Sequence, residues 1–192
     1  MPPTQRKPPR KASPASLERA ALAYLERFAA SAESLRRVLA RKVERSARAH
    51  DADRLDEARA EGTVWIDALI ERYLRSGLLD DHAYAAARTA SLRRQGRSAR
   101  AIADRLAQKG IGRALIDETL TPIRTEADEL TAAAKLARRR RLGPFRPASD
   151  RAEHRDRDLQ VLGRGGFSYD IARKVVQAES VDALETLIAE AG

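Results

Sequence analysis

Positively charged side chains are the residues of this sequence with the clearest chemical potential, because guanidinium groups bind phosphate and carboxylate oxygens. The 192 residues include 37 Lys and Arg against 28 Asp and Glu, which gives a net charge of +9. From Arg88 to Arg113, eight cationic residues accompany a single acid, Asp104. Such an excess favours a polyanionic partner, usually nucleic acid, or an acidic protein surface.

Two further clusters and one helix start extend this pattern. Lys135 and Arg138 to Arg141 form one cluster, and residues 36–48 hold the other, with six basic residues. Arg97 and Arg100 flank Ser98, a predicted N-cap, where free backbone N–H groups also attract anions. We expect the central contact surface at Arg93, Arg94, Arg97, Arg100 and Arg113. The full set of candidate binding residues is Arg93, Arg94, Arg97, Arg100, Lys109, Arg113, Arg138, Arg139, Arg140, Arg141 and Arg164.

These clusters predict contact with a nucleic-acid backbone or a protein surface more than readout of a base sequence. Few aromatic residues interleave with the arginines, so base stacking is not expected. If about six of the charges met phosphates, affinity would fall steeply with salt, with a log–log slope of roughly −4 to −5.

Catalytic and metal-binding patterns are weak. The chain has no cysteine, and its three histidines lie far apart. Gly163, Gly165 and Gly166 lack the Lys-Ser/Thr pair of a phosphate-binding loop. Asp80 and Ser168 are better explained as helix caps than as catalytic groups. We therefore predict a protein that is not an enzyme, with no cofactor and no metal.

The elements that position the arginines are predicted to be helices. Apolar residues recur at helical spacing along most of the chain, as at Leu17, Ala21, Tyr24 and Phe28, and no segment alternates as a strand would. Predicted N-caps and glycine C-caps punctuate these stripes. The N-caps are Ser13, Ser31, Asp80, Ser98 and Ser168, and the glycines are Gly77, Gly110 and Gly166. The fold class is all-α.

A degenerate internal repeat organises the helices. A shift of 56 residues places Leu106, Gly110 and Ile111 on Leu162, Gly166 and Phe167. The pattern predicts three tandem three-helix repeats, an arrangement that tends to be elongated. We expect a disordered, basic, Pro-rich tail at 1–14, repeat 1 at 15–79, repeat 2 at 80–124, and repeat 3 with a C-terminal helix at 125–192. The charged segment 44–62 is expected to be an exposed insertion of helix extension plus loop.

Residues 102–120 allow an alternative interpretation. Two helices around Gly110 resemble a helix-turn-helix that would present Arg113 to a DNA groove. Recurrence of the same unit elsewhere favours an architectural role for this segment.

The same residues resemble the RecX family, regulators of the bacterial recombinase RecA. The resemblance covers about residues 16–178. In the middle unit it rests on Leu78-Leu79-Asp80-Asp81, Tyr84-Ala85, Gly96, Ile102, Leu106 and Lys109-Gly110-Ile111. The C-terminal unit contributes Gly166-Phe167-Ser168-Tyr169-Asp170-Ile171, and the first unit contributes Leu35-Arg36 to Lys42. Family members often carry two arginines before the glycine-phenylalanine pair, whereas here Gly165 replaces the second and Arg164 remains.

The resemblance implies a function. It implies three repeats in a curved chain that is not an enzyme and lies in the groove of the RecA–DNA filament. It also implies binding of single- and double-stranded DNA and inhibition of recombination, ATP hydrolysis and coprotease activity, with consequences for DNA repair and the SOS response. We expect a cytoplasmic monomer. The alternative is a general DNA-binding or transcription-regulating helical module with no recombinase partner.

Overall fold

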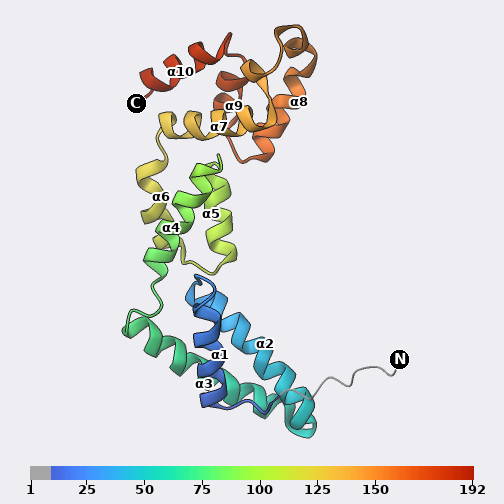
Figure 1. The fold of residues 1–192 in the computed structure, drawn as a ribbon, viewed down its shortest axis with the longest axis vertical. Coiled ribbons are helices and arrows are strands. Elements are labelled where there is room, and N and C mark those ends of the chain that lie inside the picture. The colour runs from blue at the N-terminus through green and yellow to red at the C-terminus, as the bar shows by residue number, and fades with distance from the viewer. Residues whose placement is uncertain (1–9) are drawn as a thin grey trace, which may run out of the picture. The chain divides into compact units, whose positions relative to one another are not determined.

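The computed structural model describes residues 10–192, which contain helices and turns and no strand. This confirms the predicted all-α class. The α-helices, labelled in Figure 1, are α1 (Pro14–Leu25), α2 (Ala32–His50), α3 (Leu55–Arg75), α4 (Asp81–Arg94), α5 (Ala99–Gln108), α6 (Arg113–Leu120), α7 (Glu126–Arg140), α8 (Arg151–Arg164), α9 (Tyr169–Val176) and α10 (Val181–Glu190). None of these helices is long and apolar enough to span a bilayer.

Serine caps and glycine turns set the helix boundaries where the sequence predicts them. The side chains of Ser13, Ser31, Ser98 and Ser168 each accept a hydrogen bond from the backbone N–H three residues later. Asp80 does the same for the N–H of Ala83 at 2.9 Å. The three predicted glycines, Gly77, Gly110 and Gly166, all have positive φ. Local capping chemistry therefore decides where these helices begin and end.

The chain divides into two compact units, residues 1–84 and 85–192. In the first unit, α2 and α3 pack along each other (Figure 1), and α1 covers them. A Cβ atom at Gly62 would lie 2.4 Å from a methyl carbon of Val43, so glycine allows these two helices to approach closely. The core of the unit is aliphatic apart from Tyr73, and its fully buried leucines are Leu17, Leu35 and Leu39.

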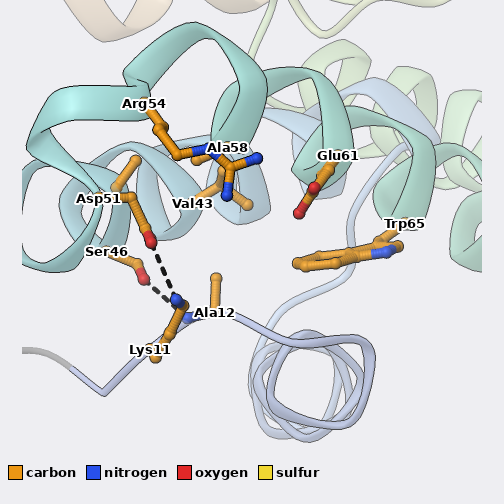
Figure 2. A pocket seen from close by; sticks show the side chains of 10 residues that line it. Lys11, Ala12, Val43, Ser46, Asp51, Arg54, Ala58, Glu61 and Trp65 are labelled. Atoms are coloured by element: carbon orange, nitrogen blue, oxygen red, sulfur yellow. Dashed lines mark hydrogen bonds and ion pairs between the residues drawn. The ribbon is translucent and has the colours of Figure 1, made fainter.

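Residues just before α1 contact α2 and the residue that follows it. Lys11 forms a 2.8 Å ion pair with Asp51, and the N–H of Ala12 donates to the Ser46 hydroxyl at 2.7 Å. Figure 2 shows both bonds beside a cavity of about 80 Å³ that Trp65 and Arg54 also line. The predicted disordered tail covers residues 1–14, of which 1–9 lie outside the described residues.

The charged segment 44–62 continues both neighbouring helices. Helix α2 runs to His50, a 3-10 turn spans Ala52–Arg54, and α3 starts at Leu55. Glu44 joins the two helices through bonds of 2.8 and 2.9 Å to Arg59, and it also accepts from Arg48 at 2.6 Å. These hydrogen bonds, first that of Arg59 and then that of Arg48, lower the pKa of Glu44 to about 2.

The second unit is built around α7, which packs against α9 and α10 (Figure 1). Its largest buried cluster joins Leu130, Leu136, Leu162, Phe167 and Val175. Helices α5 and α6 pack together at their own small interface. This unit also contains all of the arginines and lysines predicted to form the binding surface.

Candidate anion-binding surface

All eleven candidate binding residues lie in the second unit, but the structure does not bring all of them to one place. Arg93 points into the unit. Its guanidinium bonds Glu129 at 2.7 Å and the carbonyl of Arg97 at 3.1 Å, and it also donates to the carbonyl of Ile123. Only 14% of the Arg93 side chain and 18% of Glu129 are exposed. Arg93 therefore joins α4 to α7 and to the chain before α7, and its charge is already paired.

The turn between α4 and α5 rests directly on α7. Gly96 in this turn has φ +71°, and a Cβ atom there would lie 2.9 Å from the carbonyl oxygen of Ala132. Arg139 donates to the carbonyl of Gln95 at 2.9 Å from the other side. Only glycine allows both the left-handed turn and this close approach, so the turn carries Arg97 next to the C-terminal end of α7.

Arg97 is the centre of a group of unpaired positive charges. Its Nε atom is buried and has no hydrogen-bond partner among residues 10–192. The pKa of Arg97 is lowered, first by burial of its guanidinium and then by the charges of Arg105, Arg139 and Arg140. Among residues 10–192 none of these four arginines forms an ion pair with an acid, so the half-buried Arg97 lacks a counter-ion. A phosphate or carboxylate would supply it.

Further cations stand unpaired in the same unit. Arg94, Arg100, Arg140 and Arg141 are exposed, and their side chains form no hydrogen bond or ion pair within residues 10–192. Arg141 ends α7 in the left-handed conformation, with φ 55°. These side chains can turn toward an anion without breaking an existing bond.

The turn between α8 and α9 meets the start of α5. The Ser98 hydroxyl donates to the carbonyl of Gly165 at 2.8 Å, and a Cβ atom at Gly166 would lie 2.4 Å from that hydroxyl. Arg164 closes α8 just before this turn, with its Nε bonded to the carbonyl of Gln160. The contact gathers residues of α5, α7 and α8 that are distant in sequence.

Three of the candidate residues lie away from Arg97. Lys109 and Arg113 are at the opposite end of α5, which at 1.5 Å per residue is about 15 Å long. The Arg113 side chain is 96% exposed and only 3.8 Å from Asp117. Arg138 lies over the Phe145 ring, 5.3 Å from its centroid, and 3.5 Å from Glu185.

Arg105 belongs to the group around Arg97 and was absent from the predicted set. It stands seven residues after the Ser98 cap, which is two helical turns along one face of α5. This spacing in the sequence could have identified Arg105 as a member of the group. We call the group formed by Arg97, Arg105, Arg139 and Arg140 the Arg97 surface.

The basic cluster of the first unit differs from this surface because acids neutralise half of it. Arg36 pairs with Asp67, Arg37 with Glu33, and Arg48 with Glu44. In the part of the chain that the structure describes, no group of three or more His, Cys, Asp or Glu side chains is arranged to hold a metal ion. The Arg97 surface is thus the strongest candidate for contact with a polyanion.

The matches to known proteins point to one family. The family model for the second three-helix domain of RecX matches residues 80–120. The chain is 44% identical over 173 residues to the regulatory protein RecX of Myxococcus xanthus, covering 90% of each sequence. It is 34% identical to the protein of the same name from Halorhodospira halophila, covering 81% of this chain and 86% of that one. A crystal structure of a regulatory protein RecX superposes with a TM-score of 0.60 at 24% identity, over 86% of this chain and 72% of that one, and shows a shared fold.

Proposed function

The chain belongs to the RecX family of regulatory proteins, and from this membership we propose that it binds the RecA filament on DNA and inhibits it. Inhibition would extend to recombination, ATP hydrolysis and coprotease activity. The protein would act by binding and not as an enzyme, as a monomer in the cytoplasm. The helices would form the three repeats at 15–79, 80–124 and 125–192.

The observation that supports this proposal most directly is the unpaired charge at Arg97. The charges of Arg105, Arg139 and Arg140 act on Arg97, none of the four has an ion pair among the described residues, and burial of the Arg97 Nε removes the water that would otherwise solvate it. Such a group gains most when an anion with several oxygens arrives, because guanidinium groups bind phosphate and carboxylate in a bidentate manner. A nucleoprotein filament offers DNA phosphates and protein carboxylates at regular intervals.

Inhibition would follow from many modest contacts made together. Arg94, Arg100 and Arg141 add exposed charges to the same unit. Linked contacts raise the effective concentration of each neighbour, so the sum binds far more tightly than any one. A chain bound across adjacent filament subunits would then oppose the subunit movements that accompany ATP hydrolysis.

The decisive experiment is the single-strand-DNA-dependent ATPase of RecA, measured with and without stoichiometric amounts of this protein. The variant Arg97→Glu/Arg139→Glu/Arg140→Glu should lose inhibition while its helicity by circular dichroism is unchanged. The matched control reverses Arg19, Arg27 and Arg41, which are exposed in the first unit and have no ion pair among the described residues. Full inhibition by the first variant would contradict the assignment of the surface.

A general DNA-binding module is the competing function. The fully exposed Arg113 at the start of α6 is the observation that favours it. This function predicts sequence-selective binding of duplex DNA with no recombinase present, and no change in RecA ATPase rate or filament lifetime. Those two results together would replace the first proposal.

A further inference from the structure

Tyr169 is the most exposed aromatic side chain among the residues that the structure describes. Its exposed fraction is 65%, against 54% for Phe28, which stacks on Tyr24 with ring centroids 5.1 Å apart. Tyr169 makes no hydrogen bond or ring contact with any of residues 10–192. Burial of this ring in the fold therefore does not account for its presence at the first position of α9.

The ring is attached to the segment that packs beside the Arg97 surface. Three residues before Tyr169, Gly166 lies so close to the start of α5 that a Cβ atom there would be 3.3 Å from the backbone nitrogen of Ala101. Three peptide units span at most about 11 Å, so the Tyr169 backbone stays within that distance of the junction. Arg97 and Arg100 flank Ser98 on the other side of the same junction.

The charge next to Tyr169 does not oppose an incoming phosphate. Asp170 is the neighbouring acid, and its carboxylate is 3.2 Å from Arg173 and 3.1 Å from Lys174. The hydrogen bond from Lys174 is the main reason that the pKa of Asp170 is lowered. Lys174 also bonds Glu126, so these two acids and two bases balance and leave no net negative charge beside Tyr169.

We propose that Tyr169 stacks on an unpaired base of a single-stranded nucleic acid whose phosphates contact the Arg97 surface. The inference deepens the proposed function, because it names single-stranded nucleic acid as a ligand of that surface. A cationic groove with an aromatic platform is the usual arrangement for binding single strands without sequence preference. A base paired within a duplex has no free face to offer, so the tyrosine would favour single strands over duplexes.

The test measures binding of the full-length protein to fluorescent oligomers without recombinase. The ligands are an oligothymidylate of about 20 nucleotides, long enough for a typical single-strand site, and an abasic oligomer of equal length. Tyr169→Ala should weaken binding to oligothymidylate about tenfold and leave abasic binding unchanged, since stacking on one base has this magnitude. Tyr169→Phe, which keeps the ring, should bind like the wild type.

Two controls make the result decisive. Phe28→Ala removes an exposed ring from the other unit and should leave oligothymidylate binding within about twofold of the wild type. Circular dichroism should show that Tyr169→Ala retains its helices. Equal weakening for both oligomers, or none for either, would overturn the stacking role. The RecA ATPase is a separate measurement, so loss of the proposed inhibition and loss of base stacking are distinguishable.

Discussion

Ser98 and Gly165 are joined by a 2.8 Å hydrogen bond from the serine hydroxyl to the glycine carbonyl, across 67 residues of sequence. The same hydroxyl accepts the N–H of Ala101 and so caps α5. One side chain thus starts a helix and fastens the turn between α8 and α9 to it. The position of the Arg97 surface depends on this junction, which makes the junction the first place to test.

Gly166→Ala should destabilise the protein by about 2 kcal/mol or more. The residue has φ +88°, and its Cβ atom would lie 2.4 Å from the Ser98 hydroxyl. Backbone strain and overpacking each cost on the order of 1–3 kcal/mol. Urea unfolding measures the difference. Gly163→Ala, in α8 with open space around its Cβ position, is the control and should be neutral or slightly stabilising.

Arg93→Ala should cost about 3 kcal/mol of stability, because the mostly buried Glu129 carboxylate loses its charged partner and keeps only the N–H of Ala99. The adjacent Arg94→Ala removes an exposed side chain and should change stability by less than about 0.5 kcal/mol. Thermal unfolding of the two variants compares them directly. Similar melting temperatures would show that the Arg93 pair contributes little.

Asp158→Ala should be comparably damaging in the C-terminal part of the second unit. The Asp158 side chain is 1% exposed, accepts the N–H of Gly143 at 2.8 Å, and pairs with Arg146 at 3.0 Å. Loss of the carboxylate leaves the backbone N–H of Gly143 and the mostly buried guanidinium of Arg146 without this acceptor, at a cost of about 3 kcal/mol. Asp156→Ala, at an 84% exposed side chain, serves as the comparison in the same unfolding assay.

The pH dependence of stability should include a contribution from Glu44. Its pKa falls from the ordinary 4.5 to about 2 in the folded protein, because Arg59 and Arg48 bond the charged carboxylate. A lowered carboxyl pKa stabilises the fold above pH 4.5, and this stabilisation is lost as pH falls toward 2. Between these values the wild type should lose more stability than Glu44→Gln, and added salt should reduce the difference. Parallel melting curves for the two proteins would contradict the shift.

Local chemistry explains why so much of the helical architecture could be predicted. The hydroxyl of Ser98 and the positive φ of Gly110 act within one turn of the chain, so the residue types alone indicate a helix start and a helix end. The periodicity of Leu17 and Ala21 likewise marks a buried face. The family resemblance noted in the sequence is also confirmed, by a relative that is 44% identical and covers 90% of this chain.

Charge pairing could not be predicted in the same way. Arg93 and Glu129 are 36 residues apart, and nothing in the local spacing indicates that one neutralises the other. The eight cations between Arg88 and Arg113 therefore include one, Arg93, whose charge is already paired with an acid. Arg105 shows the converse: it belongs to the group only because α5 and α7 bring Arg105, Arg139 and Arg140 around Arg97, an arrangement that no repeat pattern specifies.

Salt dependence should separate the Arg97 surface from other arginines. Removing one contact with a single-strand phosphate reduces the log–log salt slope of binding by about 0.7, because fewer counter-ions are released. Arg97→Gln/Arg139→Gln/Arg140→Gln should therefore lower the slope for oligothymidylate by about 2, whereas Arg113→Gln, at the far end of α5, should leave it nearly unchanged. Titrations at several salt concentrations measure both slopes. Tyr169→Ala is expected to weaken binding at constant slope, because stacking releases no counter-ion. Equal slopes for the triple variant and the wild type would mean that these arginines meet no phosphate, and a protein carboxylate would then be the better partner for the Arg97 surface.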